Sequence, residues 1–198
     1  MSHHTPGPQQ AGLYDPSYEH DACGVAFVAD LTGRRSHSIV RKALTALKNL
    51  EHRGARGAEP DTGDGAGLLI QVPDEFFRAV VDFALPPAGR YAVGTAFLPT
   101  DDAARRLVVQ TVERIAAEEG MRVLGWRDLP IDDRHVGRIA ASTMPTFRQV
   151  FLAPQDPAVT GMDLERLAFV VRKRAEHACA DSDPKGGIGL YFPSLSSR

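Results

Sequence analysis

Hydrophobic and polar positions follow two different periods along the chain, one typical of strands and one typical of helices. Short apolar runs that end at glycine, proline or charged residues are typical of buried strands. Seven such runs predict strands at residues 25–29, 67–72, 91–98, 122–126, 138–142, 148–153 and 188–192.

Apolar residues spaced three and four apart predict helices between these strands. One apolar stripe follows Ser36 and Ser38. Another follows Thr100 and stops at Gly120, and the two aspartates directly after Thr100 suit the positive end of a helix dipole. A short helix is predicted after Asp74, and a long one over residues 163–178. Since the elements do not alternate strictly, the pattern favours a layered α+β domain over a doubly wound parallel sheet.

The first 22 residues differ from the rest of the chain. The stretch from Met1 to Tyr18 contains three prolines and two glycines and lacks the apolar core of a signal peptide. We therefore expect residues 1–22 to be a leader, with the folded domain covering residues 23–198.

Composition excludes several classes of protein. The 198 residues carry a formal net charge of −2, with 43% hydrophobic and 24% charged residues, as in globular proteins. No apolar run reaches the roughly 18–20 residues of a membrane span. Basic residues are dispersed, which argues against a nucleic-acid surface. Two cysteines cannot form a disulfide framework, so we expect a reducing, cytoplasmic location.

Cys23 is the first candidate for chemistry, because it lies at the junction between leader and domain. Taken alone it is a buried thiol at the edge of a strand. If residues 1–22 were removed, however, Cys23 would carry both a thiol and a free α-amino group. An α-amino group has a pKa of about 7.7–8.0 and can act as a general base near neutral pH. A terminal nucleophile thus carries its own base.

Two further segments stand out after the first long helix. LEHRGARGAEP, residues 50–60, is either a basic helix exit or part of a site. DTGDGAG, residues 61–67, lacks the ending of a phosphate-binding loop and precedes a strand, so it favours a tight turn beside a site. A small-ligand-binding module built on this loop is an alternative. No cysteine and histidine pairing has the spacing of a metal site.

Together these segments resemble the amino-terminal part of the large chain of glutamate synthases. The resemblance is carried by YDPSYEHDACGVAFVADLTGRRSH and LKNLEHRGARGAEPDTGDGAGLLIQVP, and continues through YAVGTAFLP, GWRDLPI, VVRKR and YFPSLSSR. It implies a class II glutamine amidotransferase of the N-terminal-nucleophile hydrolase fold, in which two antiparallel sheets lie between two helical layers (αββα).

The resemblance also implies roles for individual residues. Leader removal would make Cys23 the amino terminus; its thiolate would attack the side-chain amide of L-glutamine and release ammonia, and water would then release glutamate. Arg53, in HRG, would orient Cys23. Gly24, His52 and the loop 61–67 would shape the pocket without a chemical role.

In the complete family enzyme the ammonia reacts with 2-oxoglutarate in a synthase domain that carries FMN and an iron–sulfur cluster. This chain is expected to hold neither cofactor and no metal, since its two cysteines cannot ligate a cluster. The rest of the synthase and a small reductase subunit are the implied partners, and the pattern resembles the bacterial NADPH type. The family's oxyanion-hole Asn-Gly pair comes after the segment that matches YFPSLSSR. The chain as given is therefore expected to be incomplete at its C-terminal end, and the alternative is a fragment without activity alone.

Overall fold

The structure, a computed structural model, describes residues 24–54, 63, 65–182 and 189–198. Its contacts divide the chain into two units, Met1–Leu68 and Leu69–Arg198, which are described separately.

In the first unit one amphipathic helix and one short turn of helix follow each other directly. Helix α1 covers His37–Asn49, close to the predicted stripe, and has Ser36 as its N-terminal flanking residue. The 3₁₀ helix η2 covers Glu51–Arg53. The Leu50 N–H donates to the carbonyl oxygens of Ala46 and Leu47, and the Leu50 carbonyl accepts from the Arg53 N–H at 2.8 Å. The two helices are therefore linked by continuous main-chain hydrogen bonds.

The predicted strands at 25–29 and 67–72 do not form in the described residues. Val25, Phe27 and Leu69 are 90%, 93% and 81% exposed. A strand is stabilised by a neighbour that pairs with its backbone, and an apolar pattern alone does not supply one. These two predictions are wrong for the described structure because neither segment has a pairing partner there.

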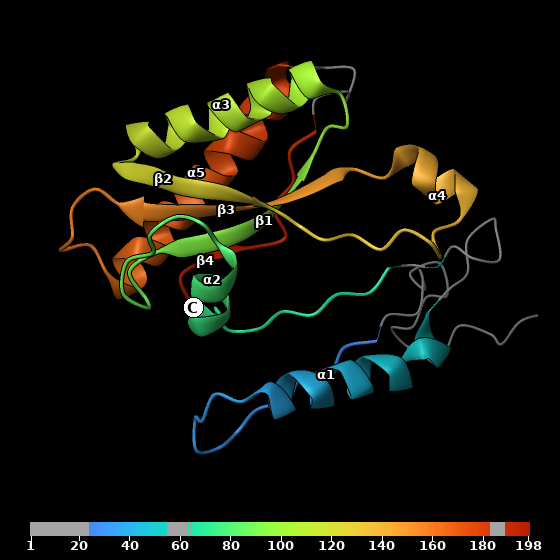
Figure 1. Cartoon of the computed structure of the whole chain (residues 1–198). Coiled ribbons are helices and arrows are strands. Elements are labelled where there is room, and N and C mark those ends of the chain that lie inside the picture. Colours follow the sequence, from blue (N-terminus) through green and yellow to red (C-terminus); the bar gives the residue numbers. More distant parts are fainter. Residues whose placement is uncertain (1–23, 55–62, 64, 183–188) are drawn as a thin grey trace, which may run out of the picture. The chain divides into compact units, whose positions relative to one another are not determined.

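The second unit is built on a four-stranded antiparallel sheet with the order β2-β3-β1-β4 (Figure 1). The register of β1 against β3 runs from Ala92↔Leu152 to Leu98↔Thr146. Strand β3 pairs on its other side with β2, and a register shift lies between Val123 and Gly125. The strands cover Ala92–Leu98 (β1), Met121–Asp128 (β2), Thr146–Pro154 (β3) and Leu195–Ser196 (β4).

Two helices cover one face of this sheet and enclose the main core (Figure 1). Helix α3 covers Asp102–Glu118 and α5 covers Gly161–Ser182. The Asp101 carboxylate caps α3 by accepting from the Ala104 N–H at 2.8 Å. Gly120 has a φ of +71°, a conformation that favours glycine, and turns the chain into β2. The start and end predicted for α3 are thus confirmed. Fully buried core residues include Val108, Val112, Ile115, Val150, Leu152, Leu164, Val171 and Phe192.

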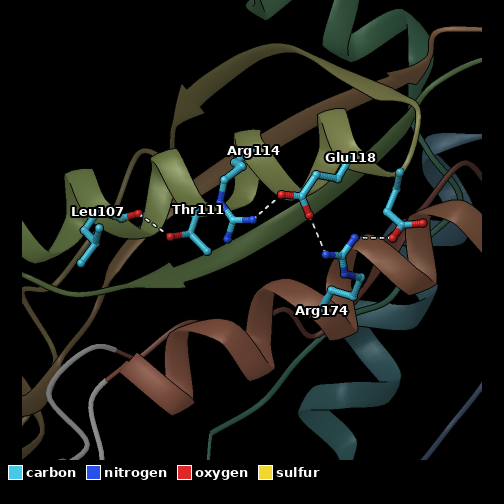
Figure 2. A network of polar contacts seen from close by, with 6 residues as sticks. Leu107, Thr111, Arg114, Glu118 and Arg174 are labelled. Atoms are coloured by element: carbon cyan, nitrogen blue, oxygen red, sulfur yellow. Dashed lines mark hydrogen bonds and ion pairs between the residues drawn. The ribbon is translucent and has the colours of Figure 1, made fainter.

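Charged side chains join α3 and α5 at the surface (Figure 2). Arg114 donates to the Glu118 carboxylate within α3. Arg174 of α5 reaches the same carboxylate at 2.6 Å and also binds Glu119. The hydrogen bonds from these two arginines lower the pKa of Glu118. The two helices are therefore joined by ion pairs at the surface as well as by packing of their buried apolar side chains.

The opposite face of the sheet is covered at one end by helix α2, Asp74–Val80. Phe77 packs there with Tyr91, Phe151 and Ala153. The Asp74 carboxylate accepts from the Tyr91 hydroxyl at 2.9 Å and from Arg78 at 2.8 Å. Burial first, and then the hydrogen bond to Asp74, raise the pKa of Tyr91, so its hydroxyl stays a donor.

Two other predicted strands need correction. Residues 138–142 belong to a helix, α4, which covers Arg138–Thr143. Alanine favours helix, and the segment has no neighbouring strand in the described structure. At the last predicted strand, 188–192, Tyr191 forms a single bridge with Phe97, and the paired residues are 195–196 instead. The α+β class with an antiparallel sheet is confirmed.

Two glutamates of α5 hold the segment from Leu190 to Ser197 against the helix. Glu176 accepts from the Phe192 N–H at 3.0 Å, and Glu165 accepts from the Ser197 N–H at 2.7 Å. Burial acts to raise the pKa of Glu176, but hydrogen bonds from Phe192, Lys173 and Arg172 outweigh it and lower this pKa. The charged form of Glu176 therefore contributes to the folded state.

We expect this contribution to disappear in acid. A carboxylate with a lowered folded pKa stabilises the protein above its unfolded pKa, about 4.3 for glutamate, and this stability is lost as pH falls through the folded value. Glu176→Gln should therefore lower the melting temperature at pH 7 and show a smaller further decrease between pH 5 and pH 3 than the wild type. Asp163→Asn, at a 71% exposed carboxylate of the same helix, is the control. Equal acid dependence in the wild type and Glu176→Gln would contradict this expectation.

Candidate active site

The predicted nucleophile, Cys23, lies outside the described residues, as do residues 61, 62 and 64 of the loop 61–67. Gly24, bonded to Cys23, is the first residue that the structure describes. The geometry of the candidate site is therefore that of Gly24 and of the residues around it in the first unit.

Gly24 packs against the end of α1 and the following turn. A Cβ placed on Gly24 would lie 3.1 Å from both Cβ and Cδ2 of Leu50, and 3.3 Å from Cβ of Arg53. Separations this short are tighter than ordinary van der Waals contacts, so a side chain at residue 24 would force its neighbours apart. The structure thus brings together Gly24 and Arg53, which are 29 positions apart in the sequence.

Arg53 ends η2, and its N–H is fixed by the carbonyl oxygen of Leu50. Among the described residues its guanidinium has no hydrogen-bond or ion-pair partner, and the residue is exposed. An arginine with free donors can bind a carboxylate or a carbonyl oxygen.

His52 is held differently, because its Nδ1 lies 2.9 Å from the carbonyl oxygen of Asn49. The ring is exposed and is tied to the main chain one turn before it. This contact stabilises the exit of the helix. The contact gives no indication of a proton-transfer partner within the described residues, and the shaping role of His52 stays a prediction.

Cys179, the second cysteine, has low reactivity because it is buried. It is 2% exposed in the core of the second unit, and burial raises the pKa of its thiol. Since the thiolate is the reactive form, Cys179 is a poor nucleophile.

Leu50 is the residue that sequence reasoning missed. The sequence shows Leu50 as the last apolar residue of the stripe after Ser36 and Ser38 and as the first residue of LEHRGARGAEP, and the structure places it beside Gly24. The helical period does identify Leu50 as inward-facing, but the period cannot show which distant residue it meets.

The described part of the chain shows neither a metal centre nor a membrane-spanning helix. It contains no cluster of three or more histidine, cysteine or acidic side chains placed to hold a metal ion. None of its helices combines the length and apolarity needed to cross a membrane. Two surface hollows of the second unit, of about 290 and 300 Å³, are lined by none of the predicted site residues.

A family model for class-II glutamine amidotransferases matches residues 23–198. The chain belongs to this family. The match begins at Cys23, the predicted nucleophile.

Curated relatives of this amidotransferase domain include several glutamate synthases. The Bacillus subtilis glutamate synthase [NADPH] large chain is 40% identical over 192 residues, which is 96% of this chain and 12% of the relative. The ferredoxin-dependent glutamate synthase 1 of Arabidopsis thaliana is 41% identical over 194 residues, with the same two shares. The glutamate synthase [NADH] of Saccharomyces cerevisiae is 39% identical over 180 residues, covering 85% of this chain and 8% of the relative. The chain spans about an eighth or less of these proteins.

Proposed function

We propose that this amidotransferase domain is the glutaminase part of a glutamate synthase and hydrolyses L-glutamine to glutamate and ammonia. The observation that carries the proposal is the family match that begins at Cys23. The contact of Gly24 with Arg53 supports it, because it places the guanidinium-bearing residue next to the neighbour of the nucleophile.

In the proposed reaction Cys23 acts first as the nucleophile. Its α-amino group takes the thiol proton, and the sulfur attacks the side-chain amide carbon of glutamine. When the C–N bond breaks, the proton passes to the nitrogen, and ammonia leaves. A glutamyl thioester on Cys23 remains. The amino group then takes a proton from water, and the resulting hydroxide attacks the thioester carbon. The C–S bond breaks, and the proton passes from the amino group to the sulfur, which gives glutamate and the free thiol.

Arg53 and its neighbours have a positioning role in this mechanism. Arg53 would orient the mature Cys23, and Gly24 would leave room for the chain at the end of α1. His52, tied to Asn49, and the loop 61–67 would shape the pocket.

In a complete synthase, the ammonia made here would react with 2-oxoglutarate in another part of the protein. A reductase subunit would be a partner of that synthase. FMN and an iron–sulfur cluster belong to that proposed part. The residues of this chain do not fit a cluster, because a cluster takes four thiolates, whereas here Cys23 is the proposed nucleophile and Cys179 is buried. We place the enzyme in the cytoplasm on the basis of its cysteine usage.

We also propose the four-layer arrangement of the N-terminal-nucleophile hydrolases for the complete domain. Outside the end of the sheet that α2 covers, described side chains on the face opposite α3 and α5 are only half-buried. The Phe97 ring meets Phe147 there at 4.8 Å and Tyr191 at 5.5 Å between centroids, and Tyr191 is 53% exposed. A second sheet would cover such a face.

Removal of residues 1–22 is the step that tests the proposed use of the α-amino group. We expect the native enzyme to have a mass that corresponds to Cys23 at its amino terminus. One extra alanine placed before Cys23 in the mature form should lower glutamine hydrolysis about 10²–10⁴-fold, because the amino group then belongs to the wrong residue. An extra alanine added at the opposite end of the protein is the matched control. Full activity with the additional amino-terminal alanine, or an active enzyme that retains Met1, would refute the mechanism.

A further inference from the structure

We propose that Leu50 is a positioning residue for the nucleophile, acting through its contact with Gly24. The proposal rests on the function proposed above. The two atoms nearest to the position that a Cβ on Gly24 would occupy are Cβ and Cδ2 of Leu50, both at 3.1 Å. Arg53 supplies the third through its Cβ at 3.3 Å.

The Leu50 side chain is attached to a fixed piece of main chain. Its N–H is shared by two carbonyl oxygens of α1, at 3.2 and 3.1 Å, and its carbonyl oxygen accepts from Arg53 at 2.8 Å. Because Leu50 is held on both sides, its Cβ cannot move without distorting the junction of α1 and η2. The contact therefore transmits the position of the helix end to Gly24.

The effect on Cys23 follows from covalent geometry. The Cys23 carbonyl carbon is bonded to the Gly24 nitrogen in a planar peptide unit, so fixing Gly24 restricts where the Cys23 α-carbon can lie. Thiol and α-amino group are both attached to that α-carbon. A displacement of about 1 Å in a reacting group can cost on the order of 100-fold in rate. Packing at Gly24 therefore helps to align the thiol nucleophile with its α-amino base.

Three substitutions in the mature native enzyme test this role. Leu50→Ala removes the Cδ2 contact and keeps the Cβ contact. Leu50→Met restores a long, unbranched side chain. Leu47→Ala is the matched control, since Leu47 is a half-exposed leucine of α1, three residues before Leu50, and supplies none of the three atoms nearest to the Cβ position of Gly24.

We expect Leu50→Ala to lower kcat for glutamine hydrolysis about 10- to 100-fold per titrated active site, with KM changed less than about twofold. Leu50→Met should recover most of this loss, and Leu47→Ala should keep the wild-type kcat per site. Hydrogen exchange at the Gly24 amide should be faster in Leu50→Ala than in Leu47→Ala. Equal kcat and equal Gly24 exchange in the two alanine variants would overturn the proposal.

A double substitution checks that the effect passes through Gly24. Gly24→Ala should lower kcat by itself, because its new Cβ meets Leu50, and should cost less in the Leu50→Ala background, where one of the two contacts at 3.1 Å, that with Cδ2, has gone. If the two substitutions lowered kcat independently, so that the double variant lost the product of the two single factors, the proposal would be contradicted. Such a result leaves the glutaminase assignment intact, whereas full activity after loss of the Cys23 thiol would refute that assignment itself.

Discussion

Cys23→Ala in the native, processed enzyme should reduce glutamine hydrolysis by at least about 10⁴-fold, because no other group can form the thioester. Single-turnover and steady-state rates of ammonia release from glutamine measure the effect. A glutamine analogue that carries an electrophilic diazoketone should add one equivalent of mass to the wild type and none to this variant. Labelling requires a formed pocket as well as a thiol, so it reports on both.

Cys179→Ala is the matched control, because it removes the other thiol of the chain. Since Cys179 is buried in the core of the second unit, its loss should affect stability and leave kcat per labelled site within about twofold. If Cys179→Ala abolished labelling while Cys23→Ala did not, the nucleophile would have been assigned to the wrong cysteine.

In a complete synthase the same variant separates the two proposed half-reactions. Cys23→Ala should lose glutamine-dependent synthesis of glutamate from 2-oxoglutarate and retain synthesis from added ammonia. Loss of both activities would show that Cys23 has a structural role instead, and retention of both would refute the proposed glutaminase function.

The elements that the sequence predicts well are those whose signals are local. Helix α3 has its cap at Asp101 and its glycine at Gly120, and both are properties of a few neighbouring residues. Strands β1 and β3 are predicted nearly to their ends, because both faces are apolar over most of their length. The predicted strand at 138–142 fails because its apolar residues fit a helix equally well, and only the presence or absence of a neighbouring strand decides.

The candidate site shows the same division between local and distant information. The order of Cys23-Gly24 and the HRG segment in the sequence indicates the family, and the structure places Gly24 beside Arg53. The contact of Gly24 with Leu50 has no signature of its own, since Leu50 also satisfies the helical stripe of α1. Contacts between residues that are far apart in the sequence depend on how the chain folds back, and a single sequence does not encode them in a readable pattern.

Phe151→Ala should be the most destabilising core substitution in the second unit. The ring of Phe151 is fully buried and meets three other aromatic rings: Phe77 edge-on at 5.0 Å, Phe83 at 5.3 Å and Tyr91 at 6.2 Å between centroids. Its loss removes these contacts and leaves a cavity between β3 and α2, at a cost of about 3–5 kcal/mol. For a protein of this size that corresponds to a melting temperature lower by on the order of 10 °C.

Phe147→Ala tests whether position rather than residue type causes the loss. Phe147 lies on the same strand and the same face, but it is half-buried, and among the described residues it meets one aromatic ring, that of Phe97, at 4.8 Å. Because less apolar area is removed from water there, we expect a smaller cost, of about 1–2 kcal/mol. Denaturant unfolding of both variants measures the difference. Equal losses would mean that the aromatic cluster around Phe151 contributes no more than a surface ring, and α2 would then not depend on Phe151 for its attachment to the sheet.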